Sequence, residues 1–222
     1  MYKNKKILGI VLARSKSKRL VGKNTLNLCG KPLFLWTLHA ARKSKYLDNI
    51  VISTDDIKII SHTKRLSYVR TIVRTKKLSG DRIASEDVVL DAIAKIKKSF
   101  DIIVVLQPTS PLRKSQDIDK AIKKMVNNNA PSIISICYKI NNNKNAIELK
   151  NGYFRKKNKN NSKGYSVNGA IYAGLNSFFK KKHTFITKKT ITYLMPQSRS
   201  IDIDNIKDFN LAKKLLKAKQ NE

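Results

Sequence analysis

The chain has 222 residues, of which 41% are hydrophobic, and this suits a single domain, residues 1–222, with a sizeable core. A formal net charge of +32 suits nucleic acid, an acidic membrane surface or a polyanionic small substrate. However, the basic residues are spread along the chain, aromatic residues make up 7%, and no apolar run approaches the roughly 20 residues of a membrane span. We therefore expect no specific nucleic-acid partner and no membrane segment. Compositional drift explains the net charge better than a dedicated nucleic-acid-binding surface does. The two isolated cysteines, Cys29 and Cys137, indicate reduced thiols in a cytoplasmic protein.

Short apolar runs alternate with amphipathic patterns over the first 137 residues. Strands are predicted at 6–13, 49–53, 68–73, 102–106 and 132–137. Helices are predicted to begin near Pro32 and to span 57–65, 83–99 and 115–127, the second of them capped by the sequence Thr54-Asp55-Asp56. This alternation predicts an α/β fold with a mostly parallel sheet.

Residues 138–165 interrupt the alternation, because they are rich in Asn, Lys and Gly. We interpret them as a β-ribbon or flap that serves as a dimerisation arm, with a disordered loop as the alternative. Beyond them, strands are predicted at 167–174, 191–195 and 200–203, followed by a closing helix at 206–218.

The segment LARSKSKRLVGKN, residues 12–24, follows the first predicted strand directly. A strand that leads into a polar loop with five basic residues indicates an anion site. Backbone N–H groups together with Arg14, Lys18 and Lys23 would surround a polyphosphate. The sequences GxxxxGK[ST] and GxGxxG are absent, so the phosphate site differs from the P-loop and dinucleotide types.

A second candidate lies near the C-terminus, where Asp202 and Asp204 alternate with Ile201 and Ile203. In an extended segment residues i and i+2 share one face, so two carboxylates would point to the same side. Two hard oxygen ligands that leave room for water and phosphate are suited to Mg²⁺. In the alternative reading, Asp204 caps the helix that begins near Asn205.

Two further polar segments follow predicted strands, where ligands bind in open α/β sheets, and a third motif lies within the strand predicted at 167–174. Residues 106–113, LQPTSPLR, either offer uncharged groups that bind a sugar or form an ordinary turn. Residues 74–85 either contact a base or a phosphate or form a solvated loop. In residues 167–172, VNGAIY, the tyrosine lines a pocket or lies in the core. The candidate residues in these segments are Gln107, Thr109, Ser110, Arg74, Ser85 and Tyr172.

The ordered set of motifs resembles the acylneuraminate cytidylyltransferases, the CMP-sialic acid synthetase type, over nearly the whole chain. The matching stretches are LARSKSKRLVGKN, GKPLFLWTLHAA, IVISTDD, VRTKKLSGDRIAS, VVLQPTSPLR, VNGAIY and SIDID. The resemblance implies a Rossmann-like sheet and transfer of CMP from CTP to the anomeric hydroxyl of a nine-carbon 2-keto sugar acid, with release of pyrophosphate. The acceptor would be of the sialic, legionaminic or pseudaminic type.

The resemblance also implies roles for individual residues. Arg14, Lys18 and Lys23 would be catalytic with Asp202 and Asp204, the two ligands of the cofactor Mg²⁺. CTP would contact Leu12, Ala13, Arg14, Ser17, Lys18, Lys23, Asn24, Arg74 and Ser85, while Gln107, Thr109, Ser110, Tyr172 and Phe185 would line the sugar pocket. The family is usually a homodimer, so Lys144 and the basic run 156–159 would reach the sugar of the partner. The rival hypotheses are a cytidylyltransferase for another keto sugar acid such as Kdo, and a basic nucleic-acid-binding protein without catalysis.

Two departures from the family pattern are visible. Gly is common where Arg19 stands, and Pro with a basic residue is common where Val21 and Gly22 stand. An arginine that usually precedes NGAIY is replaced by Ser166-Val167. The first departure affects the phosphate loop and the second affects the acceptor sugar.

Overall fold

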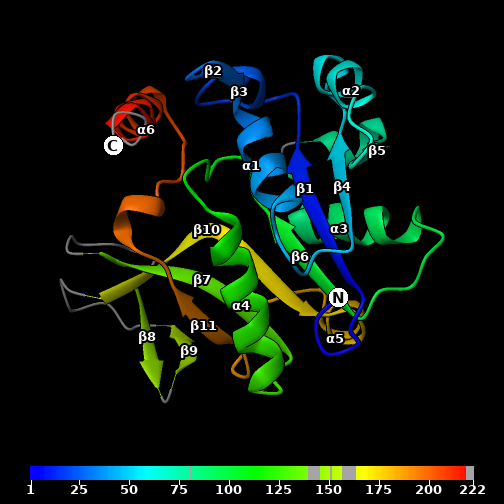
Figure 1. Cartoon of the computed structure of the whole chain (residues 1–222), viewed down its shortest axis with the longest axis vertical. Helices are drawn as coiled ribbons and strands as arrows, with labels where there is room; N and C mark the ends of the chain where they lie inside the picture. Colours follow the sequence, from blue (N-terminus) through cyan, green and yellow to red (C-terminus); the bar gives the residue numbers. More distant parts are fainter. Residues whose placement is uncertain (81, 140–145, 151, 157–163, 219–222) are drawn as a thin grey trace.

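The computed structural model describes residues 1–80, 82–139, 146–150, 152–156 and 164–218. Within them, one sheet holds nine strands in the order β5-β4-β1-β6-β10-β7-β11-β9-β8 (Figure 1). Its strands are β1 (Ile7–Ala13), β4 (Asn49–Thr54), β5 (Arg70–Val73), β6 (Ile102–Leu106), β7 (Ser132–Lys139), β8 (Ala146–Lys150), β9 (Tyr153–Lys156), β10 (Gly164–Leu175) and β11 (Ile191–Leu194). A separate pair joins β2 (Asn27–Leu28) to β3 (Lys31–Pro32).

Strands β5, β4, β1 and β6 run parallel, and β7 runs parallel to β11. Strand β10 is antiparallel to both of its neighbours, β6 and β7. Val11 pairs with Ile52 on one side and with Leu106 on the other, so β1 lies at the centre of the parallel part. The predicted Rossmann-like, mostly parallel α/β sheet is confirmed, and the carboxyl ends of β1, β4 and β6 meet at one edge (Figure 1).

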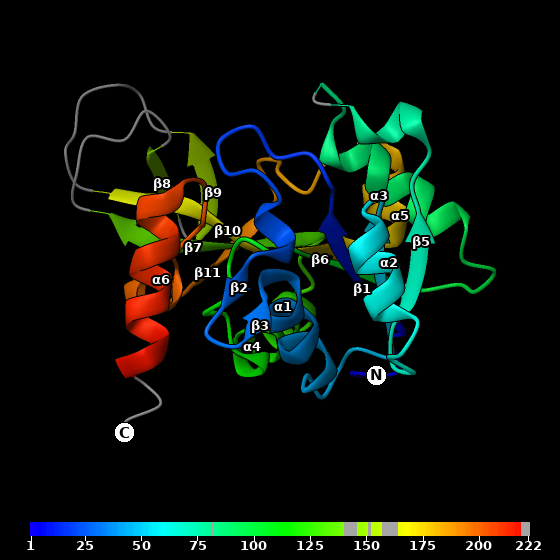
Figure 2. The ribbon, with the colours of Figure 1, turned by 90° about the horizontal axis from the view of Figure 1, so that it is seen from above.

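Helices cover both faces of the sheet, because β1 and β6 carry apolar side chains toward both sides. Helices α1 (Leu33–Arg42), α2 (Ile57–Thr63) and α4 (Ser115–Asn127) pack on one face through residues such as Phe34, Ile59 and Ile122. Helices α3 (Ser85–Ala94) and α5 (Asn176–Lys182) pack on the other through Val89 and Phe179 (Figure 2). No described helix is long and apolar enough to cross a membrane.

Helix α6 (Ile206–Ala218) packs apart from the sheet, in a smaller apolar cluster. Phe209 and Leu216 contact this cluster together with Leu28, Leu33 and Ile203. The cluster joins the C-terminal helix to the segment after β1, and it thereby brings residues 200–204 close to the loop 12–24, some 180 residues apart in sequence.

The β-ribbon expected within 138–165 is present as the antiparallel pair β8 and β9, in which Leu149 pairs with Phe154. Strand β8 also pairs with β10 and strand β9 with β11, so the ribbon extends the far end of the sheet. Residues 140–145, 151 and 157–163 lie outside the described part of the chain. The role of the ribbon as a dimerisation arm, and the assignment of 1–222 to a single domain, stay predictions.

Two predicted elements differ clearly from the structure, and one helix was not predicted. Helix α3 ends at Ala94 rather than at residue 99, because the chain must turn to reach β6; there Asp101 accepts a hydrogen bond from the Lys6 backbone N–H (2.8 Å). Residues 200–203 form no strand, since Ile203 makes a single 2.8 Å hydrogen bond to the Thr109 carbonyl instead of a ladder. Helix α5 was not predicted, because its seven residues bury only Phe179 and show no helical period.

Candidate active site

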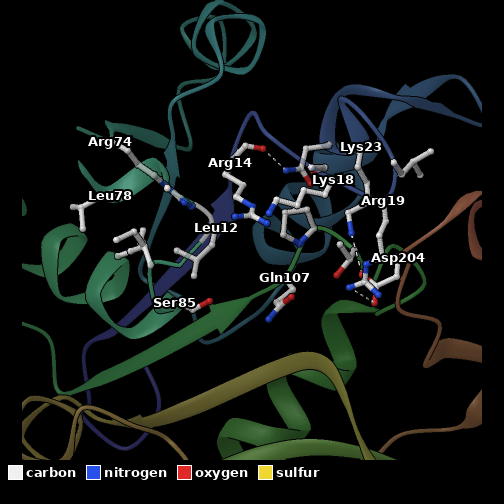
Figure 3. Close-up of a pocket in the computed structure, with 18 residues that line it drawn as sticks. Leu12, Arg14, Lys18, Arg19, Lys23, Arg74, Leu78, Ser85, Gln107 and Asp204 are labelled. Carbon is white, nitrogen blue, oxygen red and sulfur yellow. Dashed lines mark hydrogen bonds and ion pairs between the residues drawn. The ribbon is translucent and has the colours of Figure 1, made fainter. Parts of the chain in front are cut away.

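A cavity of about 510 Å³ opens at the carboxyl edge of the sheet (Figure 3). Leu12 enters it from β1, Arg74 from the segment after β5, and Gln107 from the segment after β6. Four segments far apart in the sequence line the cavity with Leu12, Arg14, Ser17, Lys18, Arg19, Leu20, Lys23, Asn24, Arg74, Leu78, Gly80, Ile83, Ser85, Val88, Gln107, Pro108, Thr109 and Asp204. Of the residues predicted for CTP, only Ala13 is missing, because its side chain is fully buried in β1.

The loop 12–24 is held around the cavity by hydrogen bonds that its own sequence does not reveal. Asn24 is buried, and its amide donates to the Arg14 carbonyl (2.9 Å), which closes the loop on itself. Asp55 accepts from the backbone N–H of Ser15 (2.8 Å) and from its hydroxyl (2.6 Å). Although burial by itself would raise the pKa of Asp55, these bonds lower it below the usual value.

The sequence suggested Asp55 only as part of a helix cap, and the structure divides that role. Asp56 caps α2, since its carboxylate accepts from the Lys58 N–H (2.9 Å). Asp55 turns instead toward Ser15 and holds the loop 12–24 in place. Sequence reasoning missed this function because the two partners lie 40 residues apart.

The departure at Val21 and Gly22 has a conformational consequence. Gly22 has φ +61°, a left-handed conformation that costs other residues about 1 kcal/mol or more. It precedes the 3₁₀ turn Lys23–Thr25, whose first residue points back into the cavity. Val21 is 83% exposed, so the residue that replaces proline makes little packing contact.

On the opposite wall, Arg74 is buried and fixed by Ser53. Its Nε donates to the Ser53 hydroxyl (3.0 Å) and its Nη2 to the Ser53 carbonyl (2.9 Å). Burial lowers the pKa of Arg74 to about 10, while the nearby charge of Asp55 opposes this shift. The guanidinium therefore stays charged at neutral pH. Leu78, Ile83 and Val88 add an apolar surface to this wall that the sequence did not single out.

At the other end of the cavity, Asp204 meets two cations (Figure 3). Its Oδ2 lies 3.1 Å from Arg19 Nη2, and its Oδ1 lies 3.3 Å from Lys23 Nζ. Lys23 also donates to the Ile203 carbonyl, so the loop 12–24 and residues 203–204 are joined directly.

The alternative reading of Asp204 as a helix cap is wrong. Asn205 caps α6, because its side chain accepts from the N–H groups of Lys207 (2.8 Å) and Asp208 (3.1 Å). Asp208 completes the cap by accepting from the backbone of Asp204 and Asn205. The Asp204 carboxylate is therefore left to face the cavity.

Asp202 is exposed as a whole residue, but its carboxyl oxygen Oδ2 faces Gly169, and Ile203 beside it is fully buried. The partial burial of its carboxyl group raises the pKa of Asp202; Asp204 raises it further, and Lys23 opposes the shift. The buried hydroxyl of Thr109 has no partner at hydrogen-bonding distance among the described residues. Gly169, with φ +74°, lets the chain pass close, since a Cβ there would lie 3.4 Å from Asp202 Oδ2.

A smaller cavity of about 180 Å³ shares Ser85 and Gln107 with the large one. Tyr172 and Phe185 also line it, with ring centroids 6.3 Å apart, and burial raises the pKa of Tyr172 to about 12. The structure thus brings three of the predicted sugar-pocket residues into one cavity beside the large one. Its remaining lining is Glu86, Val89, Val105 and Ile186.

The other predicted sugar-pocket residues lie elsewhere. Thr109 lines the large cavity, whereas Ser110 is fully buried and lines neither cavity. Lys144 and residues 157–159 of the basic run lie outside the described residues. Ser166, the departure before NGAIY, is buried at 3% exposure and faces Cys137 across a 3.8 Å contact.

Arg113, which the sequence did not single out, braces the turn between the two cavities. Its guanidinium is 3% exposed and donates to Gln107 O (3.2 Å), Ala170 O (2.8 Å) and Thr37 Oγ1 (2.6 Å). It therefore ties the segment after β6 to β10 and α1. Burial lowers the pKa of Arg113 to about 9, which still leaves the group charged at neutral pH.

The described residues contain no cluster of three or more His, Cys, Asp or Glu side chains that would hold a metal by themselves. Two carboxylates at the edge of a basic cavity are a suitable set for Mg²⁺, which keeps several waters and shares substrate phosphates. Asp202 and Asp204 therefore fit a cation that arrives with a polyphosphate.

Comparison with known proteins agrees with this geometry. Residues 8–222 match the family described as Cytidylyltransferase. The chain is 31% identical over 227 residues to the CMP-N,N'-diacetyllegionaminic acid synthase of Legionella pneumophila, covering 97% of this chain and 98% of that protein. It is 27% identical over 224 residues to the pseudaminic acid cytidylyltransferase of Campylobacter jejuni, covering 96% of this chain and 97% of that protein.

The fold is similar to that of a solved CMP:2-keto-3-deoxy-manno-octonic acid synthetase complexed with CTP. The TM-score is 0.74 at 16% identity, with 96% of this chain and 99% of the other covered. A match over nearly the whole chain, with the predicted motifs gathered around one cavity, leads to one conclusion: the chain belongs to the cytidylyltransferase family.

Proposed function

We propose that this cytidylyltransferase transfers CMP from CTP to the anomeric hydroxyl of a nine-carbon 2-keto sugar acid of the sialic, legionaminic or pseudaminic type, releasing pyrophosphate. The observation that carries the proposal is the pair of adjoining cavities, which share Gln107 and Ser85. The larger is lined by five basic side chains and suits a nucleoside triphosphate, and the smaller is lined by aromatic rings and suits a sugar. The relatives named for legionaminic and pseudaminic acids support this acceptor class.

The reaction requires an alcohol oxygen to attack the α-phosphorus in line while pyrophosphate leaves. No covalent catalyst is needed, so the protein contributes position and charge. Arg14, Lys18 and Lys23 line the cavity from one loop and would offset the negative charge of the triphosphate and of the leaving group. Arg74, fixed by Ser53, would hold the nucleoside end on the opposite wall.

We further propose that Asp202 and Asp204 hold Mg²⁺. When bound, the ion would neutralise phosphate charge and lower the pKa of the attacking hydroxyl. The carboxylate of Asp202 lies beside Gly169 of β10, the strand that also contributes Tyr172 to the smaller cavity, and it senses the charge of Lys23 in the loop 12–24. Its position therefore supports a role at the junction of nucleotide and acceptor.

Pyrophosphate release from CTP and Mg²⁺ with a panel of sugar acids tests the proposal. We expect release with at least one nine-carbon acid, none without Mg²⁺, and little with the eight-carbon acid Kdo. Asp202→Asn should lower the rate by about 100-fold or more, since a bound cation supplies several kcal/mol of charge stabilisation. The matched control is Asp87→Asn, which makes the same chemical change at an exposed residue that lines neither cavity.

Several outcomes would contradict the proposal. Release with Kdo alone would move the acceptor to the eight-carbon class. No release with any acid, together with DNA binding that persists at high salt, would favour the nucleic-acid-binding alternative.

We also propose a homodimer in the cytoplasm, where CTP is available, with the β8–β9 ribbon at the interface. The exposed side chains of Tyr138, Tyr153 and Leu194, on strands at this end of the sheet, support an interface there. Sedimentation equilibrium of the full chain measures the assembly, and a monomer at micromolar concentration would contradict it.

A further inference from the structure

Arg19 occupies one oxygen of Asp204, at the end of the cavity where the cation is proposed to bind. The two oxygens of this carboxylate contact different cations, because Arg19 Nη2 lies 3.1 Å from Oδ2 while Lys23 Nζ lies 3.3 Å from Oδ1. Arg19 is also the position where the sequence departs from a glycine. The chain has thus placed a long cation directly on a proposed metal ligand.

The two cations differ in how firmly they are held. Lys23 is only 13% exposed and also donates to the Ile203 carbonyl, so it is anchored from two sides. Arg19 is 71% exposed, and Asp204 is the partner that the structure gives it among the described residues. Exposed ion pairs are weak because water and salt screen them, so a divalent cation can displace Arg19 far more easily than Lys23.

We propose that Arg19 is a replaceable counter-ion of Asp204. It holds Oδ2 when no nucleotide is bound, and it competes with the divalent cation for that oxygen. The inference rests on the proposed metal site at Asp202 and Asp204, and it adds a regulatory consequence. Free cation binds weakly in the absence of nucleotide, because it must first release the guanidinium, whereas a triphosphate in the cavity offers Arg19 another anion.

Direct binding of Mn²⁺ tests this proposal independently of activity. Binding in the absence of nucleotide is measured by the loss of the free-ion signal in electron paramagnetic resonance. We expect Arg19→Ala to bind Mn²⁺ about two- to fivefold more tightly than the wild type, the range for loss of one exposed ion pair. The matched control is Lys16→Ala, which removes the same charge from the same loop at an exposed residue that does not line the cavity. Its affinity should change by less than about 1.5-fold.

A double-substitution cycle separates competition from general electrostatics. In an Asp204→Ala background, Arg19→Ala should have no more effect than Lys16→Ala, because the shared oxygen is gone. The gain from Arg19→Ala should also shrink at about 0.5 M KCl, where an exposed pair is screened.

The failures of the two proposals are distinguishable. If Mn²⁺ binding weakens in Asp204→Ala but Arg19→Ala matches Lys16→Ala, the metal site stands and the counter-ion proposal is overturned. If no variant binds Mn²⁺, or if Asp202→Asn and Asp204→Ala bind it like the wild type, the metal site itself is overturned.

Discussion

Replacement of Arg113 by methionine is expected to destabilise the protein, although it also removes the free-energy cost of burying a cation. The guanidinium is 3% exposed and makes three hydrogen bonds, to Gln107 O, Ala170 O and Thr37 Oγ1. Bonds from a charged donor contribute about 1.5–3 kcal/mol each. The free-energy cost of desolvating the cation opposes this contribution. Part of that cost comes from Nε, which has no hydrogen-bond partner among the described residues.

The acceptors left behind set the size of the effect. The Gln107 carbonyl keeps donors in Thr37 Oγ1 and the Ser110 N–H, both at 3.3 Å. The Ala170 carbonyl loses its bond to the side chain, at a point where the β10–β7 register is irregular. With methionine filling most of the volume, we expect a loss of about 3 kcal/mol of unfolding free energy, or about 6–12 °C in Tm for a domain of this size.

Thermal unfolding followed by circular dichroism, together with urea titration, measures this effect. Arg65→Met is the matched control, since Arg65 is exposed, and it should change stability by less than about 0.5 kcal/mol. Arg113→Lys should fall between the two because it keeps the charge but not the planar fork. An Arg113→Met protein as stable as the wild type would refute the reasoning, since desolvation would then cancel all three bonds, as happens in some buried ion pairs.

Two further predictions follow from the carboxylates whose pKa is lowered. Asp55→Asn removes the charged acceptor of both Ser15 hydrogen bonds, so the CTP concentration for half-maximal pyrophosphate release should rise about tenfold. An unchanged concentration would mean that the loop 12–24 keeps its shape without the Asp55 charge. Asp117 is buried, which alone would raise its pKa, yet the 2.7 Å pair with Arg199 and the Lys114 N–H lower it. Stability from this carboxylate is therefore full above about pH 4 and is lost as the pH falls through the lowered pKa. Arg199→Met should cost about 2 kcal/mol at pH 7 and much less near pH 2.5 in urea titrations, and an equal cost at both pH values would exclude the ion pair as its cause.

Much of the fold could be predicted from local patterns in the sequence. The apolar run 102–106 and the helices 115–127 and 206–218 were predicted with the bounds that the structure gives, because a run buried on both faces and a strong 3.6-residue period are both local signals. The polar segments after β5 and β6 were placed at the carboxyl edge by a general property of parallel sheets, and the family resemblance joined them with the loop 12–24 as one site.

What the sequence by itself determined about this protein is therefore its α/β class, its main elements and the segments that surround one basic cavity. Only the tertiary structure decided which side chain does what inside that cavity. Asp55 reaches Ser15 across 40 residues, Lys23 reaches Ile203 across 180, and Arg113 reaches Ala170 across 57. Such contacts depend on how the elements pack and not on the residues beside each partner, so no local pattern encodes them. For the same reason Ser110, polar and next to Thr109, is buried away from both cavities, and Arg19 meets Asp204.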